Sequence, residues 1–387
     1  MKRVRYADLG RLDLAPAVLD PGVRAAVREI FDAVVAGGDE AVREHARELD
    51  GLDVDEPLEV GIDERHQAVA GLPDDLREAL DLSIDRVREA AVRHLDHIGR
   101  FNYSVGDSDV EVRPIPIQRV GAYVPGGRYP LPSTAVMTVV PARAAGVEEI
   151  VVCSPRIHPH TVAAAHLSGA DRVFRVGGAQ AIAAMAAGTK TIPRVDMIVG
   201  PGNSYVQAAK AMAFGRVGID MIAGPTEVMI VADGTAEPEL LAADLLAQAE
   251  HDVEAIPVLV TTDTAMADAV IAEVERQVAF LNTGEVARSA LDRNGLVVEV
   301  DDLEQAALVV DRKAPEHLEV VLADPDAFID RCRNYGCAFI GPHTFEVLGD
   351  YVLGTNHVLP TGGAGRYTAG LSVLSFLRFP SVIRTGP

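Results

Sequence analysis

Short β-branched runs alternate with alanine-rich helical segments from about residue 115 onward. Each run of a first set leads into Gly or Pro and then a helical stretch; these runs are 120–124, 148–153, 171–176, 195–200 and 228–232. A second set comprises 256–261, 295–300, 317–322 and 337–341, with helices expected over 236–250, 263–281, 302–311 and 324–334. This alternation is typical of βαβ units around a parallel sheet. The sequence therefore predicts an α/β fold.

The length of the chain indicates more than one domain. At roughly 100 to 200 residues per domain, 387 residues suggest two or three domains. Residues 22–48 and 62–99 repeat apolar positions at helical spacing. We expect a helical N-terminal region over 1–114, a first lobe over 115–235, a second lobe over 236–345 and a catalytic loop with the C-terminal segment over 346–387.

Charge and composition exclude several classes of partner. The chain carries 35 Lys+Arg against 57 Asp+Glu, a net charge of −22, which disfavours nucleic acid and anionic membranes. No apolar run reaches the roughly 18 residues of a membrane span, and the N-terminus lacks the apolar core of a signal peptide. Three cysteines are too few for a disulfide framework. We expect a cytoplasmic protein with a small-molecule substrate.

Three glycine-rich loops follow predicted strands, at residues 123–133, 176–185 and 199–206. Ligands of open α/β sheets bind beyond the carboxyl ends of the strands, where glycine lets backbone amides approach a phosphate. None of the loops is the standard dinucleotide fingerprint, because Tyr205 stands at its last glycine position. The loops indicate a nucleotide site, with simple tight turns as the alternative.

A second group of residues has the chemistry of metal ligands. Gln248 and His251 are three residues apart near the end of a predicted helix, so they share one face. Asp350 and His357 lie in a segment too rich in Gly, Thr and Asn for a helix. Nitrogen and oxygen donors of this kind suit zinc. Alternatively, His251 caps its helix and Gln248 is an ordinary surface residue.

Adjacent Glu316 and His317 stand just before a buried-looking strand. A carboxylate beside an imidazole suits general acid–base chemistry, because histidine exchanges a proton near neutral pH. Neighbouring residues of a strand point to opposite faces, so the pair needs a bend, which Pro315 makes possible. The alternative is a strand that merely begins with two polar residues.

Seven motifs, in this order, resemble those of the histidinol dehydrogenase family. They are Tyr123-Val-Pro-Gly-Gly, Val176-Gly-Gly-Ala-Gln-Ala, Gly200-Pro-Gly-Asn, Ala223-Gly-Pro-Thr-Glu, Gln248-Ala-Glu-His, Pro315-Glu-His-Leu and Gly349-Asp-Tyr with Gly354-Thr-Asn-His-Val-Leu-Pro-Thr. The resemblance implies two incomplete Rossmann-like lobes, a homodimer, and a zinc- and NAD-dependent oxidoreductase. Such an enzyme oxidises a primary alcohol through an aldehyde to a carboxylate in two hydride transfers.

The resemblance also implies roles for individual residues. Glu316 and His317 match the acid–base pair, and the NAD contacts match Tyr123, Gln180 and Asn203. The zinc ligands match Gln248, His251 and Asp350. Residues on the substrate side match Thr226, Gln248, His251, His317, Glu346, Asp350 and His357.

Some features depart from the family pattern. Family members typically continue beyond the segment that ends here at Pro387, and that tail supplies a fourth zinc ligand to the partner subunit. Thr226 stands where serine is usual, and the loop 126–132 with Arg128 is closer to sulfopropanediol dehydrogenases. The alternatives are therefore the same chemistry on another polar alcohol, or a catalytically weak nucleotide-binding homologue.

Overall fold

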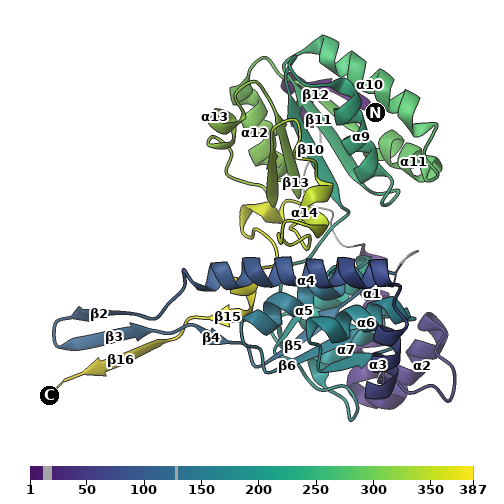
Figure 1. Ribbon diagram of the computed structural model, residues 1–387, viewed down its shortest axis with the longest axis vertical. Coiled ribbons are helices and arrows are strands. Elements are labelled where there is room, and N and C mark those ends of the chain that lie inside the picture. The colour runs from purple at the N-terminus through teal and green to yellow at the C-terminus, as the bar shows by residue number, and fades with distance from the viewer. Residues whose placement is uncertain (12–19, 127–129, 387) are drawn as a thin grey trace. The chain divides into compact units, whose positions relative to one another are not determined.

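The computed structural model describes residues 1–11, 20–126 and 130–386, so Arg128 lies outside the described residues. The chain divides into two compact units (Figure 1). Unit 1 is built mainly from Ala223–Leu348, with the N-terminal strand and Leu359–Gly370. Unit 2 contains Leu19–Ile222, Gly349–Val358 and Leu371–Pro387. The four-region division expected from the sequence stays a prediction.

Unit 2 contains a parallel sheet of five strands. Their spatial order is β7 (Arg172–Phe174), β6 (Glu149–Cys153), β5 (Arg119–Tyr123), β8 (Met197–Val199) and β9 (Gly218–Ile219). The chain moves outward from β5 through β6 to β7 and then returns to the other side of β5 with β8. The strand order therefore reverses between β5 and β8, and a crevice forms at such a switch point.

Helices cover both faces of this sheet. One core lies between the sheet and α3 (Ile62–Ala70), α4 (Asp74–Leu95), α5 (Pro132–Ala144) and α6 (Pro159–Ser168). The other core involves α1 (Pro21–Gly37), α2 (Asp39–Asp50), α7 (Gly178–Ala187) and α8 (Ser204–Ala213). The two helical stretches expected in the first hundred residues each divide in two, because Gly38 adopts a positive φ of 56° and Pro73 precedes α4.

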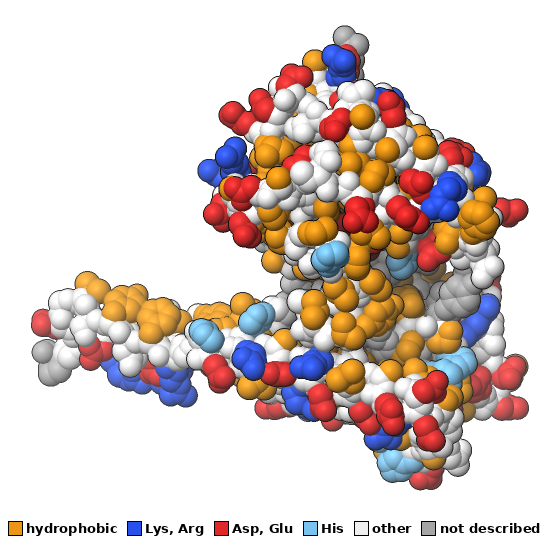
Figure 2. Space-filling view, turned by 45° about the horizontal axis from the view of Figure 1, so that its top comes forward, with side chains coloured by type: hydrophobic (Ala, Val, Ile, Leu, Met, Phe, Trp, Pro, Cys, Tyr) orange, Lys and Arg blue, Asp and Glu red, His pale blue; other side chains and the backbone are white. Residues whose placement is uncertain are grey.

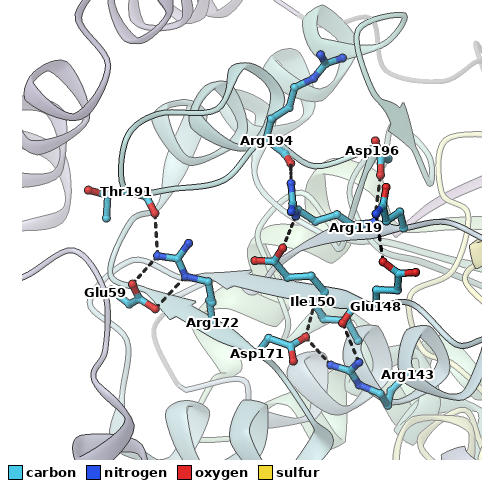
Figure 3. Close-up of polar contacts among 12 residues, drawn as sticks. Glu59, Arg119, Arg143, Glu148, Ile150, Asp171, Arg172, Thr191, Arg194 and Asp196 are labelled. Carbon is cyan, nitrogen blue, oxygen red and sulfur yellow. Dashed lines mark hydrogen bonds and ion pairs between the residues drawn. The ribbon is translucent and has the colours of Figure 1, made fainter.

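Ion pairs and hydrogen bonds join the amino ends of the strands in unit 2 (Figure 3). Arg172 at the start of β7 donates to both carboxylate oxygens of Glu59 and to the carbonyl of Thr191. Arg119 at the start of β5 donates to the carbonyl of Arg194, at 2.9 Å. This edge of the sheet is occupied by structural contacts, which leaves its carboxyl edge for ligands.

The sheet of unit 1 has six strands, all parallel. Their order is β1 (Lys2–Arg5), β12 (Leu296–Glu299), β11 (Ile256–Thr261), β10 (Glu227–Ala232), β13 (His317–Val321) and β14 (Cys337–Ile340). One face packs on α9 (Pro238–Ala249), α10 (Thr264–Val278) and α11 (Gly284–Asn294). The other face packs on α12 (Leu303–Lys313) and α13 (Pro325–Ile329).

The predicted α/β class is confirmed, whereas one expected grouping of strands is wrong. The run at 228–232 was expected with the preceding strands, but β10 pairs with β11 and β13 in unit 1. An apolar run identifies a buried strand but carries no information about which sheet it joins. Within the described ranges, no helix combines the length and the apolar character needed to cross a bilayer.

Smaller elements complete the chain. Three antiparallel strands form an arm that extends away from the helices of unit 2 (Figure 1), namely β2 (Phe101–Val105), β3 (Ser108–Val112) and β16 (Ser381–Thr385). Another antiparallel pair joins β4 (Ile115–Pro116) to β15 (Leu377–Arg378). The remaining helices are short: α14 (Val347–Tyr351) and the 3-10 turns η1 (Tyr6–Arg11), η2 (Ala364–Arg366) and η3 (Val373–Phe376).

Candidate active site

Glu316 and His317 lie at a bend that opens β13. Ala314 adopts a left-handed conformation with φ of 52°, and Pro315 follows it. Beyond this bend His317 is the first residue of the strand, and its Nδ1 lies 3.7 Å from Glu316 Oε2. Both side chains are buried, with 6% and 5% of their residue surfaces exposed. The bend that the sequence required is present, and it brings the carboxylate and the imidazole together.

Glu316 is held by two hydrogen bonds in a buried position. Its Oε2 accepts from Thr226 Oγ1 at 2.7 Å and from the backbone N–H of Glu227 at 2.9 Å. Burial raises the pKa of Glu316 to about 8, against the opposing effects of the Thr226 hydrogen bond and of the charges on His251 and Lys313. A carboxyl group with such a pKa exchanges its proton close to neutral pH, as general acid–base chemistry requires.

The ring of His317 is oriented by the backbone of β10. Its Nδ1 lies 3.2 Å from the carbonyl oxygen of Glu227, which can only accept a hydrogen bond. Nδ1 therefore carries the hydrogen, and Nε2 keeps a lone pair that can accept a proton. Glu346 Oε1 lies 3.6 Å from Nδ1 and adds a second carboxyl group beside the ring.

Gln248 connects Thr226 to Glu346. Its amide group, on the last turn of α9, is fully buried and lies 2.8 Å from Thr226 Oγ1. With the amide turned to satisfy Glu346, its nitrogen donates to the Glu346 carboxylate at 2.9 and 3.1 Å, and its oxygen lies 2.8 Å from Thr226 Oγ1, whose single O–H donates either to this oxygen or to Glu316. The four polar groups of Gln248, Thr226, Glu346 and Glu316 thus form one buried network.

His251 lies beyond the end of α9, which stops at Ala249. Its backbone N–H donates to the carbonyl of Gln248 at 3.3 Å, and its side chain is exposed in a turn. The charge of His251 is one of the influences that lower the pKa of Glu316. Unit 1 therefore brings together six of the predicted residues: Thr226, Gln248, His251, Glu316, His317 and Glu346.

This cluster lies at the amino ends of its strands. Thr226 precedes β10 and His317 begins β13, the two strands between which the order of the sheet reverses. Five of the six residues lie before or at the start of a strand, whereas Glu346 follows β14, so the loops at the carboxyl ends, where nucleotides usually bind in such sheets, contribute one of them.

Asp350 and His357 belong to unit 2 instead. Asp350 lies on α14, and His357 follows a loop that is fixed to the helices of that unit. Asn356 Nδ2 donates to the carbonyl of Met137 at 2.8 Å, and Gly354, with φ of 79°, lies against the backbone of Arg86. Across residues 1–11, 20–126 and 130–386, no three His, Cys, Asp or Glu side chains are placed to hold a metal ion.

The predicted NAD contacts line a cavity of about 880 Å³ in unit 2. Tyr123 ends β5, Gln180 lies in the first turn of α7, and Asn203 caps the N-terminus of α8. The cavity lies at the carboxyl ends of the strands, beside the switch point between β5 and β8. Its volume is within the range of about 300 to 1,000 Å³ that small-molecule sites occupy.

Polar groups in this cavity are partly satisfied by the protein. Tyr123 Oη accepts from the N–H of Gly178 at 3.1 Å, and burial raises the pKa of Tyr123 to about 12, so its hydroxyl is neutral. Gln180 Nε2 donates to Asp50 Oδ2 at 3.1 Å. Among the described residues Gln180 Oε1 is buried without a hydrogen-bond partner, which leaves an acceptor for a ligand N–H or O–H.

Comparison with known proteins decides the family. The family model for histidinol dehydrogenase matches residues 16–386. The chain belongs to the histidinol dehydrogenase family. The histidinol dehydrogenase of Thermus thermophilus is 48% identical over 367 residues, covering 94% of this chain and 87% of the relative. That of Parasynechococcus marenigrum is 46% identical, covering 94% and 84%.

Solved structures agree with this assignment. The crystal structure of histidinol dehydrogenase from Elizabethkingia anophelis matches with a TM-score of 0.93 at 32% identity, covering 100% of this chain and 90% of that one. An acetylating aldehyde dehydrogenase from Geobacillus thermoglucosidasius has a TM-score of 0.53 at 13% identity, covering 99% and 97%, which indicates a shared fold alone. The family resemblance predicted from the seven motifs is confirmed, and with it an oxidoreductase of the histidinol dehydrogenase type.

Several residues of this family member were missed by the motif analysis. Asp50, at the end of α2, accepts from the N–H of Gly177 at 2.8 Å as well as from Gln180. Lys210 donates to the carbonyl of Gly200 at 2.9 Å and pairs with Asp220, which accepts from the N–H of Gly200 at 2.7 Å. Lysine is rare in this chain, so the presence of Lys210 within an apolar helix could have indicated from the sequence that this residue has a specific role.

Proposed function

We propose that this protein oxidises L-histidinol to L-histidine with NAD as the hydride acceptor. The observation that carries the proposal is the buried network of Thr226, Gln248, Glu316, His317 and Glu346 in a chain of this family. The relatives described above are named histidinol dehydrogenases, which supports histidinol over other polar alcohols.

The cavity of unit 2 supports NAD as the cofactor. Gln180 Oε1 lacks a partner in the described structure and can accept from an amide or hydroxyl group of the nucleotide. Asn203 accepts two backbone N–H groups of α8 with its carbonyl oxygen, which orients its amide N–H₂ group as a donor. Tyr123, Gln180 and Asn203 would bind NAD, which accepts the two hydrides when bound.

A zinc ion fits the donor chemistry of three further residues. We assign the zinc ligands as Gln248, His251 and Asp350. An amide oxygen, an imidazole nitrogen and a carboxylate are donors that zinc accepts in proteins. When bound, zinc would hold the substrate oxygen and lower the pKa of the alcohol.

His317 and Glu346 would act in the first oxidation. His317 Nε2 accepts the alcohol proton, because Nδ1 is committed to the Glu227 carbonyl. The carboxylate of Glu346, 3.6 Å from Nδ1, stabilises the imidazolium that forms. Thr226, Glu346 and His357 would contact the substrate.

Glu316 would act in the second oxidation. In its ionised form it takes a proton from the water that adds to the aldehyde, and Thr226 keeps its carboxylate in place. One alcohol and one water then give one carboxylate, with two hydrides transferred to two NAD and three protons released. The pKa of about 8 makes Glu316 a stronger base than an ordinary carboxylate.

We also propose that the protein acts as a cytoplasmic homodimer. The arm of unit 2 carries an apolar face that its own three strands do not cover, and a second copy of the chain would bury it. Phe101, Tyr103 and Val105 alternate along β2 on this face, with 56%, 49% and 65% of their surfaces exposed.

The first experiment counts NADH formed per histidinol consumed by the zinc-loaded protein. Two NADH per histidinol are expected. An absence of NADH from protein shown to hold zinc would contradict histidinol as the substrate.

Two substitutions separate the roles of the histidines. His317→Asn is expected to lower kcat by at least about a hundredfold, the usual contribution of a general base, with bound zinc unchanged. His251→Asn is expected to lose zinc and activity together. If both variants kept their zinc and their activity, the assigned site would be wrong.

A further inference from the structure

Two acidic side chains of unit 1 face each other behind the catalytic cluster. Asp244 lies on α9 and Glu319 on β13, and their carboxyl groups are within hydrogen-bond range. Both line a cavity of about 10 Å³, close to the least volume that holds one water molecule. Glu319 is 1% exposed, and Asp244 is half-buried.

The surroundings of the pair offer no positive charge. The described residues that line the cavity include one other acid, the exposed Glu237 at the start of α9, and no Lys, Arg or His. On the neighbouring strands Ile230 and Phe339 stand opposite Glu319. Two carboxylates this close in a poorly solvated place repel each other, so one proton shared between them is the stable state.

The same pair is attached to the catalytic cluster through Glu346. Glu319 Oε1 accepts the backbone N–H of Glu346 at 3.1 Å, and the Glu346 carboxylate lies 3.6 Å from His317 Nδ1. Glu319 and His317 are two residues apart on β13, so both point toward α9. Asp244 and Gln248 are one helical turn apart, so both face β13.

We propose that Asp244 and Glu319 are positioning residues that share one proton and hold the Glu346 backbone, and thereby set its carboxylate beside His317. Glu319 supplies the acceptor for the Glu346 N–H, and Asp244 keeps Glu319 in place through the shared proton. The role in catalysis rests on the proposed function, whereas the shared proton does not depend on it.

The pKa values of the two groups agree with this arrangement. Burial raises the pKa of Asp244 to about 6 and that of Glu319 well above its ordinary value, and the charge of Asp244 raises the latter further. The other titratable groups near the pair are Glu237, Glu346 and His317, and His343 lies exposed on the adjoining loop. Loss of the shared proton at high pH would place two charges beside Glu346 and loosen its position.

The shared proton is tested by infrared difference spectroscopy of the protein without substrate or metal at pH 7. Subtracting the Glu319→Gln spectrum from the wild-type spectrum is expected to leave a protonated-carboxyl band that shifts in D₂O. Glu237→Gln removes a carboxylate from the same cavity and is the matched control, with no such band expected. A wild-type minus Glu319→Gln spectrum without the band would overturn the shared proton.

The positioning role is tested by kinetics on the same variants. Glu319→Gln retains an acceptor for the Glu346 N–H, so its kcat at pH 7.5 is expected within about threefold of the wild type, whereas Glu319→Leu loses at least about tenfold. NAD affinity, which reports on unit 2, stays unchanged in both.

The pH profile provides a readout that a purely structural role would not change. In Asp244→Asn the shared proton is absent, so the fall of kcat/KM at alkaline pH is expected to move by at least about half a pH unit, whereas Glu237→Gln keeps the wild-type profile. Unchanged kcat in Glu319→Leu, or identical profiles for Asp244→Asn and the wild type, would overturn the positioning role. Because the infrared band needs no turnover, failure of the proposed function is distinguishable from failure of this inference.

Discussion

Thr226 Oγ1 lies 2.7 Å from Glu316 Oε2, so a hydroxyl group orients the carboxylate that is proposed to activate water. The same oxygen lies 2.8 Å from the Gln248 amide, which makes Thr226 the bridge between the acid–base pair and a proposed zinc ligand. A buried hydroxyl with two polar partners is costly to remove, because both partners lose a hydrogen bond.

Thr226→Val should therefore lower kcat by about tenfold, the cost of roughly 1.4 kcal/mol in the transition state. The hydrogen bond from Thr226 lowers the pKa of Glu316, so its removal should raise that pKa and move the acidic limb of the pH–rate profile, on which Glu316 becomes ionised, to higher pH. Thr226→Ser keeps the hydroxyl and should retain both the rate and the profile. Equal losses in the two variants would show that keeping the hydroxyl does not preserve the rate, and would contradict its role as the deciding group.

The raised pKa of Glu316 predicts how stability depends on pH. The fold raises this pKa from 4.5 to about 8, so the neutral form is favoured in the folded state. This contribution to stability is fully present below about pH 4.5 and is lost as the pH rises to about 8. Urea unfolding of the metal-free protein between pH 5 and 9 should show a decline with pH that is smaller in Glu316→Gln. If Glu316→Gln shows the same decline of stability with pH as the wild type, the decline comes from other titrating groups.

A buried ion pair lies beside this site. Lys313 and Glu227 are 4% and 1% exposed and are in direct contact, and burial lowers the pKa of Lys313 to about 8. Lys313→Met leaves the buried Glu227 carboxylate without its cation, with Oε1 still accepting from the Gly362 N–H at 2.9 Å. The free energy of unfolding should fall by about 3–5 kcal/mol, as for other broken buried pairs.

The double variant Lys313→Met, Glu227→Gln separates charge from packing. It has no uncompensated charge, so urea unfolding should show more than half of the lost stability restored. A double variant no more stable than Lys313→Met would indicate that the packing of the lysine chain, and not its charge, stabilises unit 1.

Local patterns predicted the parallel strands well because each is a short apolar run. Residues 256–261 were predicted at the bounds that β11 has in the structure. The edge strand β1 was missed because Lys2–Arg5 is charged and short, and the arm was missed because β2 and β3 mix polar and apolar residues. Pairing between distant segments, as in β3 with β16, leaves no local pattern.

The buried Glu316–His317 pair could be found from the sequence because the two residues are adjacent in it. Glu316 and His317 stand side by side, and Gln248 and His251 are three residues apart. Asp244 and Glu319 are 75 residues apart and meet only when α9 packs on β13, so no spacing rule could pair them. Lys313 is the last residue of α12, and a lysine at that position is usually exposed to solvent, where it interacts favourably with the helix dipole. Its burial could therefore not be predicted from the sequence.

Gly200, three residues before the cavity residue Asn203, is a position where only glycine fits. Its φ is 112°, and a Cβ there would lie within the contact distance of the Tyr123 carbonyl oxygen. Lys210 and Asp220 hold its carbonyl and N–H, so the loop cannot yield easily. Gly200→Ala should raise the KM for NAD by at least about tenfold, with kcat less affected.

Gly218→Ala is the matched control for this effect. Gly218 lies in β9 of the same sheet without a positive φ, and a Cβ there would meet its nearest neighbour at an ordinary 3.5 Å. The KM for NAD should stay within about twofold of the wild type. If Gly200→Ala also kept its KM, the loop that ends at Asn203 would not belong to the NAD site.

The arm of unit 2 is where the proposed dimer can be tested. Its apolar face combines Phe101, Tyr103 and Val105 with residues of the paired strands, since Tyr103 is opposite Val110 and Val110 is opposite Ile383. Figure 2 shows hydrophobic side chains gathered along one side of the arm and charged ones on the other. Ile383 is 67% exposed, and the Phe101 and Tyr103 rings stack at 6.4 Å.

A three-stranded sheet of this kind needs a second layer over its apolar face to be stable. In the proposed dimer the second copy supplies that layer, so a charge on the apolar face should weaken dimerisation. Sedimentation of the wild type should give twice the chain mass of 41.1 kDa. Tyr103→Asp should raise the dimer dissociation constant by at least about tenfold. Asn102→Asp adds the same charge on the opposite face and should leave the dimer intact, because neighbouring residues of a strand point to opposite sides. Equal effects of the two variants would show that charge alone, and not burial of this face, controls the association.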